Sequence, residues 1–113
     1  MASKQPKNKE LNFDFLFHAV LSLQSLEECD AFFKDLCTIS ELKAMSQRLQ
    51  VAKMLSERVV YSDIVTKTGA STATISRVNR SLNYGYDGYD EVFERLDEKG
   101  IRPPAIADAG KNQ

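Results

Sequence analysis

The 113-residue sequence predicts an all-α domain of about six helices. Apolar residues recur at spacings of three and four through most of the chain, which is the period of an amphipathic helix. Two segments open with the hydroxylated residue and the glutamate of a capping box, a common start of a helix. No segment combines alternating apolar and polar residues with many β-branched side chains, so the sequence predicts no strand.

The composition is that of an ordinary globular domain, with 42% hydrophobic and 27% charged residues. No apolar run approaches the roughly 18 residues of a membrane span. The N-terminus lacks the apolar segment of a secretory signal. Cys29 and Cys37 are spaced neither as a redox pair nor as metal ligands, so we expect reduced, packed thiols. We therefore expect a cytoplasmic protein without membrane contact, bound metal or cofactor.

Three segments follow from the distribution of apolar residues. Residues 1–10 are predicted to be a disordered N-terminal tail, and residues 11–100 the helical domain. Residues 101–113 are predicted to be a flexible C-terminal tail. Pro103 and Pro104 remove backbone donors there, and the apolar content is too low to offset the cost of ordering.

The first predicted helix, residues 11–24, is apolar around nearly its whole circumference (LNFDFLFHAVLSLQ). A surface helix needs only an apolar stripe, so a helix of this kind is buried on several sides. In so short a chain a second copy is the simplest source of the missing cover, and we predict a symmetric homodimer centred on this helix. A central core helix in a monomer is the alternative. His18, the single histidine, is expected to be a core residue.

The next two helices each begin at a capping box. Ser25 and Glu28 open the first, and Thr38 and Glu41 open the second. A last helix, within YDGYDEVFERLDEKG, is predicted to end at Gly100, because glycine readily adopts the left-handed conformation that terminates helices.

Between them, YSDIVTKTGASTATISRVNRSL is interpreted as two short helices joined at Gly69, with Ser62 capping the first, residues 63–68. Ser71 caps the second, which runs to about Asn83, and Gly69 supplies a positive φ. The apolar positions suit packing of the two helices on each other and on the body: Ile64, Val65, Ala70, Ile75, Val78 and Leu82. This is the spacing of a helix-turn-helix.

The net charge of −1 conceals two oppositely charged segments. Residues 58–83 carry four basic side chains and one acidic one, a net charge of +3. Residues 84–100 carry six acidic and two basic side chains, a net charge of −4. The basic segment coincides with the helix-turn-helix, which favours double-stranded DNA as its partner. Small side chains at the start of the second helix allow close approach to base edges in the major groove, and arginines can contact phosphate. The candidate DNA-binding residues are Ser62, Ser71, Thr72, Ala73, Thr74, Ser76, Arg77 and Arg80.

These features predict a sequence-specific DNA-binding transcriptional regulator, expected to be a repressor. The alternative is a protein-interaction module that uses the helix-turn-helix as a scaffold without specific DNA binding. An enzyme is not expected, because the sequence offers no convergent set of titratable groups with a nucleophile or general base.

The segment LSERVVYSDIVTKTGASTATISRVNRSL resembles the helix-turn-helix of the tryptophan repressor superfamily, especially its YerC/YecD-like branch. The shared core is Gly69, Ala70 and residues 73–77, and the likeness covers roughly residues 11–96. The resemblance implies an intertwined homodimer of the Trp repressor type, with two reading heads. It also implies palindromic sites whose halves lie about one helical turn apart.

By the same resemblance, an effector pocket would be formed by Thr38, Arg48, Arg77 and the neighbouring Val78. The family's tryptophan-binding member has glycine where this chain has Val78, whose branched side chain would fill the space of the indole ring. Tryptophan is therefore not expected as a cofactor, and the effector is unknown. A guanidinium still suits another small carboxylate ligand. The alternative role for Arg48 is a surface ion pair or an interface contact. Ser62 stands where the family's tryptophan-binding member has a base-contacting arginine. The DNA sequence that this chain recognises therefore cannot be taken from that member's operator.

Overall fold

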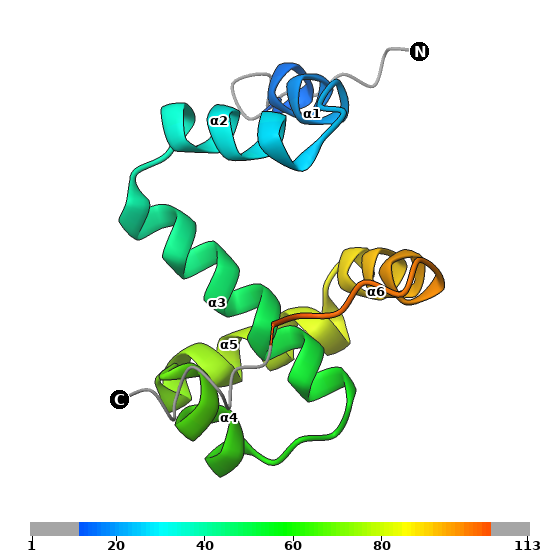
Figure 1. The fold of residues 1–113 in the computed structure, drawn as a ribbon. Coiled ribbons are helices and arrows are strands. Elements are labelled where there is room, and N and C mark those ends of the chain that lie inside the picture. The colour runs from blue at the N-terminus through cyan, green and yellow to red at the C-terminus, as the bar shows by residue number, and fades with distance from the viewer. Residues whose placement is uncertain (1–11, 105–113) are drawn as a thin grey trace. The chain divides into compact units, whose positions relative to one another are not determined.

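The computed structural model describes residues 12–104, and this part of the chain contains six α-helices and no strand (Figure 1). The predicted all-α fold is confirmed. The helices are α1 (Asp14–Leu21), α2 (Leu26–Leu36), α3 (Ile39–Ser56), α4 (Tyr61–Thr68), α5 (Thr72–Tyr84) and α6 (Gly88–Glu98). The predicted N-terminal tail and most of the predicted C-terminal tail lie outside the described residues. The chain divides into two compact units, one ending at Leu42 and one beginning at Lys43.

Side-chain caps fix the helix starts in the first unit. The Thr38 hydroxyl accepts from the Glu41 amide at 3.0 Å, and the Glu41 carboxylate accepts from the Thr38 amide at 2.8 Å, which confirms this capping box. The Ser25 hydroxyl accepts from the Glu28 amide at 3.1 Å as predicted. The Glu28 carboxylate accepts from the backbone amide of Gln24 at 2.9 Å. A complete capping box would use the amide of Ser25 instead.

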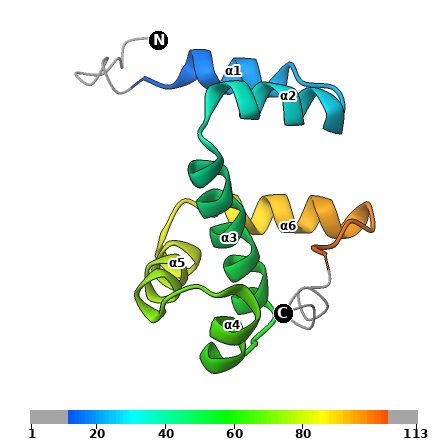
Figure 2. The ribbon, with the colours of Figure 1, turned by 60° about the vertical axis from the view of Figure 1, so that its left-hand side comes forward.

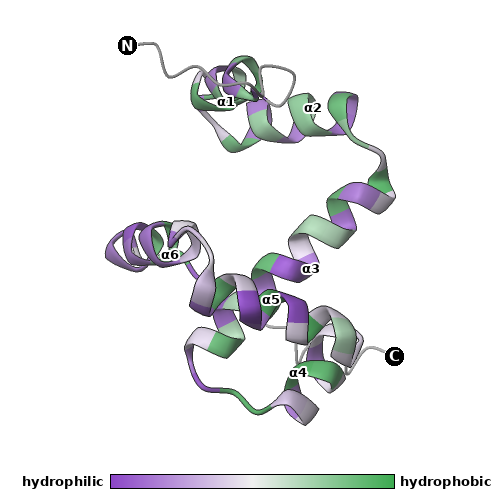
Figure 3. Ribbon diagram, turned by 180° about the vertical axis from the view of Figure 1, so that it is seen from behind, coloured by the Kyte–Doolittle hydropathy of each residue, from purple (hydrophilic) through white to green (hydrophobic). Residues whose placement is uncertain are grey.

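The helices α1 and α2 contain no buried residue within a single chain. Phe15 is 89% exposed and Leu21 is 79% exposed, and apolar residues are spread along both helices (Figure 3). His18, which we expected in a core, is exposed as well. Ala19 and Val20 of the same helix are half-buried, but this cover does not extend to His18.

The second unit is built around an apolar core that joins the C-terminal half of α3 to α4, α5 and α6 (Figure 2). Burial of one such aliphatic side chain contributes about 1.5–3 kcal/mol. The core therefore holds the helix pair α4–α5 firmly on α3. Its buried members are Val51, Ala52, Ile64, Ala70, Ile75, Val78 and Phe93.

One charged side chain, Lys53 of α3, is buried at the edge of this core with 8% of its surface exposed. Its ammonium lies 3.0 Å from the Asp97 carboxylate and 3.5 Å from that of Glu57, and 5.1 Å from the centre of the Phe93 ring. A buried charge is costly without such partners. Lys53 thus ties α3 to α6.

The end of α6 is a Schellman motif, as the position of Gly100 predicts. Gly100 has a φ of 72°, its amide donates to Asp97 O at 3.0 Å, and the Ile101 amide donates to Leu96 O at 2.9 Å. The chain then returns to the end of α3, where Arg102 lies 3.0 Å from the carboxylate of Glu57, the residue that follows the helix. Residues 101–104, the beginning of the segment expected to be flexible, therefore make specific contacts.

Candidate nucleic-acid interface

The turn between α4 and α5 is centred on Gly69, whose φ of 75° confirms the predicted left-handed conformation. Its amide donates to Val65 O at 2.9 Å and closes the last turn of α4. A Cβ atom at this position would meet no atom within 4 Å, so the need for glycine comes from the backbone and not from crowding. A side chain in this conformation costs about 1–2 kcal/mol.

The second helix of the pair begins as predicted. Ser71 is the N-cap of α5, and its hydroxyl accepts from the Thr74 amide at 3.0 Å. The same hydroxyl donates to the Thr74 hydroxyl at 3.1 Å. These two candidate residues therefore hold the start of α5, and the neighbouring Thr72 and Ala73 present their side chains beside it.

The first helix of the pair begins differently from the prediction. Ser62 is not the N-cap: Val60 occupies that position with extended backbone and no side-chain cap, and Ser62 lies inside α4. The partly buried Val59 packs against the core, which fixes the entry of the chain two residues earlier than the serine suggests. Ser62 remains exposed, and its carbonyl accepts from the Thr66 hydroxyl at 3.0 Å.

The two faces of α5 separate as the apolar spacing predicts. Ile75 and Val78 are buried at 0% and 2% exposure. The exposed side chains are Ser71, Thr72, Ala73, Ser76, Arg77 and Arg80, and Thr74 is half-buried. Within residues 12–104, neither Arg77 nor Arg80 forms an ion pair. Both guanidinium groups are therefore unpaired among these residues, on the same helix as the small side chains.

A further contact, which the sequence pattern does not reveal, fixes the turn to α3. The Gln47 amide nitrogen on α3 donates to Thr68 O, at the end of α4, at 3.1 Å. The Thr68 hydroxyl donates to Ile64 O at 2.7 Å and accepts from the Ala70 amide at 3.1 Å. Gln47 is thus a positioning residue for the helix pair. It is 21 residues from its partner, a separation at which local signals carry no information.

We expect Gln47→Met to weaken DNA binding several-fold, because the methionine keeps the shape of the side chain but loses the donor to Thr68 O. The lost hydrogen bond is worth about 1 kcal/mol. Gln47→Lys restores a donor at this carbonyl and is expected to recover part of the affinity. Fluorescence anisotropy with a labelled duplex checks the affinity, and circular dichroism melting checks the fold. Equal DNA affinity of the wild type and the methionine variant would contradict a positioning role.

The residues of the possible effector pocket lie in different parts of the structure. Val78 is a core residue, consistent with an inward-facing side chain, whereas Arg48 and Arg77 are exposed. Thr38 belongs to the first unit and is engaged in its capping box. Arg48 forms no ion pair within the described chain, so the ion-pair alternative has no partner there. An effector at these residues stays a prediction.

Two other features are absent from residues 12–104. No group of three or more histidine, cysteine, aspartate or glutamate side chains is arranged to hold a metal ion in this part of the chain. None of its helices is long and apolar enough to cross a membrane.

The chain is all-α, and a turn that contains glycine joins α4 to α5, whose outer face is exposed. These features define a helix-turn-helix protein. The chain belongs to the Trp repressor protein family, whose model matches residues 11–97. It is 56% identical over 92 residues to the uncharacterized protein YerC of Bacillus subtilis (strain 168), covering 81% of this chain and 86% of the relative. A TrpR-like protein from Eubacterium eligens ATCC 27750 has a similar solved structure, with 61% identity and a TM-score of 0.74, covering 80% of this chain and 91% of that one. The resemblance to the YerC-like branch is confirmed.

Proposed function

We propose that this protein is a sequence-specific DNA-binding transcriptional regulator, acting as a repressor, that inserts the start of α5 into the major groove of double-stranded DNA. The observation that carries the proposal is the exposed N-terminal end of α5. Short side chains and the Ser71 cap lie at this end, and two arginines that form no ion pair within residues 12–104 follow on the same helix. Membership of the Trp repressor family supports the same class of function.

The start of α5 suits close contact with bases and with the backbone. Thr72 and Ala73 are short, so the helix can approach base edges, where a hydroxyl meets acceptors and a methyl group meets the thymine methyl. The first amides of a helix have no partner within it, and they bind phosphate oxygens well. Arg77 and Arg80 lie further along and contact phosphate, which positions the helix without reading sequence.

Dimerisation supplies the second reading head. The helices α1 and α2 bury no residue within the chain, so their apolar side chains need a partner surface. We infer that a second copy provides it in a symmetric homodimer. Two identical reading heads related by a two-fold axis then bind a palindromic site.

Thr72→Val is expected to change the sequence preference and to leave the salt dependence of binding unchanged. Valine keeps the branched shape of threonine but loses the hydroxyl that contacts base edges, and it removes no charge. A good base contact is worth about 1–3 kcal/mol of discrimination. Competition between duplexes that differ at single positions measures the change. An unaltered ranking of these duplexes would show that Thr72 does not read bases.

Salt titration separates the proposed function from the scaffold-only alternative. DNA affinity is expected to fall linearly with the logarithm of salt concentration, because bound counterions are released. An apolar protein partner would be nearly indifferent to salt. A dimer that fails to bind any duplex at low salt would contradict the proposal.

Because Val78 is a core residue, adding tryptophan is expected to leave the affinity unchanged.

A further inference from the structure

A polar pocket of about 460 Å³ lies in the second unit, where the end of α3 meets the second half of α5 and the start of α6. This volume falls within the roughly 300–1,000 Å³ of small-molecule sites. The proposed DNA contacts use none of its lining residues, so the pocket is a separate feature of the fold. Leu55 and Leu82 form its apolar lining, and the polar side chains are Ser56, Arg58, Asn79, Asn83 and Asp90.

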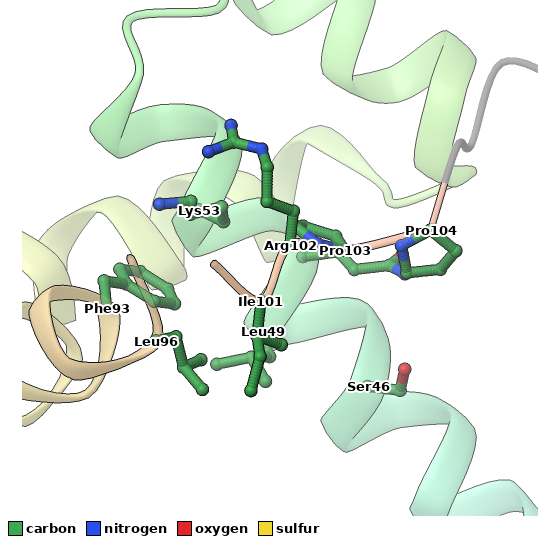
Figure 4. A pocket seen from close by; sticks show the side chains of 10 residues that line it. Ser46, Leu49, Lys53, Phe93, Leu96, Ile101, Arg102, Pro103 and Pro104 are labelled. Atoms are coloured by element: carbon green, nitrogen blue, oxygen red, sulfur yellow. The ribbon is translucent and has the colours of Figure 1, made fainter. Parts of the chain in front are cut away.

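The pocket is lined by one cation and one anion, and each lacks an ion-pair partner. Neither the Arg58 guanidinium nor the Asp90 carboxylate forms an ion pair within residues 12–104. The pocket between α3, α6 and the residues after α6 is different (Figure 4). It is mainly apolar, and both of its cations, Lys53 and Arg102, are paired with carboxylates. The polar pocket thus keeps two opposite charges available to a ligand.

Arg58 occupies a backbone position that glycine usually takes. It ends α3 in a Schellman motif: its amide donates to Leu55 O at 3.0 Å, and the Val59 amide donates to Met54 O at 3.0 Å. Its φ of 67° is close to the 72° of Gly100, which fills the same position of the motif after α6. A side chain is strained in this conformation, whereas glycine is not. The strained arginine therefore points to a role for its guanidinium in the pocket.

Two asparagines of α5 provide hydrogen-bonding groups beside these charges. The Asn83 side-chain nitrogen donates to Asn79 O at 3.0 Å and to the Asn79 side-chain oxygen at 3.1 Å. These bonds leave the Asn79 amide nitrogen as a donor and the Asn83 amide oxygen as an acceptor. The Ser56 hydroxyl donates to Lys53 O at 2.6 Å, and its oxygen can still accept. The pocket therefore offers neutral donors and acceptors as well as the two charges.

We propose that this pocket binds a small zwitterion, a molecule that carries both a carboxylate and an ammonium group. The Arg58 guanidinium binds the carboxylate and the Asp90 carboxylate binds the ammonium, each through charge-assisted hydrogen bonds. A zwitterion leaves neither charge unmatched. A simple anion would meet the Asp90 carboxylate, and a simple cation would meet the Arg58 guanidinium. The site does not depend on DNA binding by α5.

Titration of the ¹⁵N-labelled full-length protein, followed by NMR spectroscopy, tests the site. The zwitterionic probes are glycine, β-alanine, γ-aminobutyrate and ε-aminocaproate, which hold their two charges at increasing separations. Butyrate, butylamine and inorganic phosphate carry charge of one sign only. We expect at least one zwitterion to shift the backbone amides of Arg58, Asn83 and Asp90 saturably, and the other three compounds to bind at least about tenfold more weakly.

Two outcomes of this titration would overturn the proposal. The first is the absence of a saturable shift at these amides with every zwitterion. The second is binding of butyrate, butylamine or phosphate as tightly as the best zwitterion, because one of the two charged residues would then have no role.

Substitution of the charged residues gives a second test. Arg58→Gly and Asp90→Asn are each expected to raise the Kd of the best zwitterion at least about tenfold. Lys99→Gln and Glu94→Gln remove the same charges at exposed positions outside the pocket, and they are expected to have no effect. Because glycine suits this backbone conformation, Arg58→Gly is expected to melt at or above the wild-type temperature, so that lost binding is not confused with unfolding. Wild-type affinity in either pocket variant would contradict the assignment.

Discussion

The double variant Arg77→Ala, Arg80→Ala is expected to lose roughly 10- to 100-fold in affinity for every duplex at low salt, whatever its sequence. Both guanidinium groups are exposed and free of ion pairs within the described residues, so both can neutralise phosphates. Each lost phosphate contact makes the slope of log affinity against log salt less steep by about 0.9, and the four contacts that the proposed dimer loses make it less steep by about 3.6. Anisotropy titrations at four or five salt concentrations measure both quantities.

Arg95→Ala is the matched control for this variant. Arg95 is an exposed arginine of the acidic α6, where its guanidinium lies 3.9 Å from Glu91. Arg95→Ala removes one positive charge from each chain, half of what the double variant removes, at a surface that we do not assign to DNA. We expect Arg95→Ala to change the DNA affinity and its salt dependence only slightly. A loss of affinity for the control half as large, on a logarithmic scale, as that of the double variant would mean that only the total charge matters.

Ile75→Ala is expected to destabilise the second unit by about 2–5 kcal/mol. Ile75 is fully buried in the core that joins α5 to α3 and α4, and truncation leaves a cavity there. Chemical denaturation at one fixed protein concentration gives the free energy of unfolding, because a dimer's stability depends on concentration. Ser81→Ala, an exposed position of α5, is the control and is expected to stay within about 0.5 kcal/mol of wild type.

The loss of stability at Ile75 should also reduce DNA binding. At temperatures where the second unit of the Ile75→Ala variant is unfolded, we expect weak DNA binding. At temperatures where the unit remains folded, we expect the DNA affinity of the wild type. Binding that stays at wild-type strength after the unit has melted would contradict the assignment of α5 as the reading helix.

Local chemistry explains the parts of the fold that the sequence predicts correctly. Gly69 takes a positive φ because glycine alone does so without strain, and Ser71 caps α5 because a short hydroxyl reaches the third amide. Thr38 and Glu41 cap each other for the same reason. Each of these signals acts within four residues, and each is legible in the chain itself.

Tertiary contacts explain what the sequence pattern does not predict. Ser62 has the chemistry of a cap, but packing of Val59 sets the start of α4 at another residue. The bond from Gln47 to Thr68 and the pairs of Lys53 and Arg102 span 21, 44 and 45 residues. Periodicity says which face of a helix is apolar, but it does not say which distant partner a single polar side chain will meet.

The residues after α6 also make contacts that the sequence pattern does not indicate. Two adjacent prolines and few apolar residues predicted a flexible tail from residue 101. Its first residues are held by the Schellman motif at Gly100 and by Glu57, the residue that follows α3. The composition of a short segment does not indicate such contacts, and the flexibility of residues 101–113 stays a prediction.

Selection of bound sequences from a random duplex pool is the direct test of sequence-specific recognition by α5. Wild-type protein and the Arg77→Ala, Arg80→Ala variant are run in parallel, with and without a panel of amino acids. We expect the wild type to select a palindromic consensus with half-sites about one helical turn apart. We expect this result without added tryptophan. The double variant should yield far less bound DNA. A wild-type pool that remains random after repeated rounds would contradict sequence-specific recognition by α5.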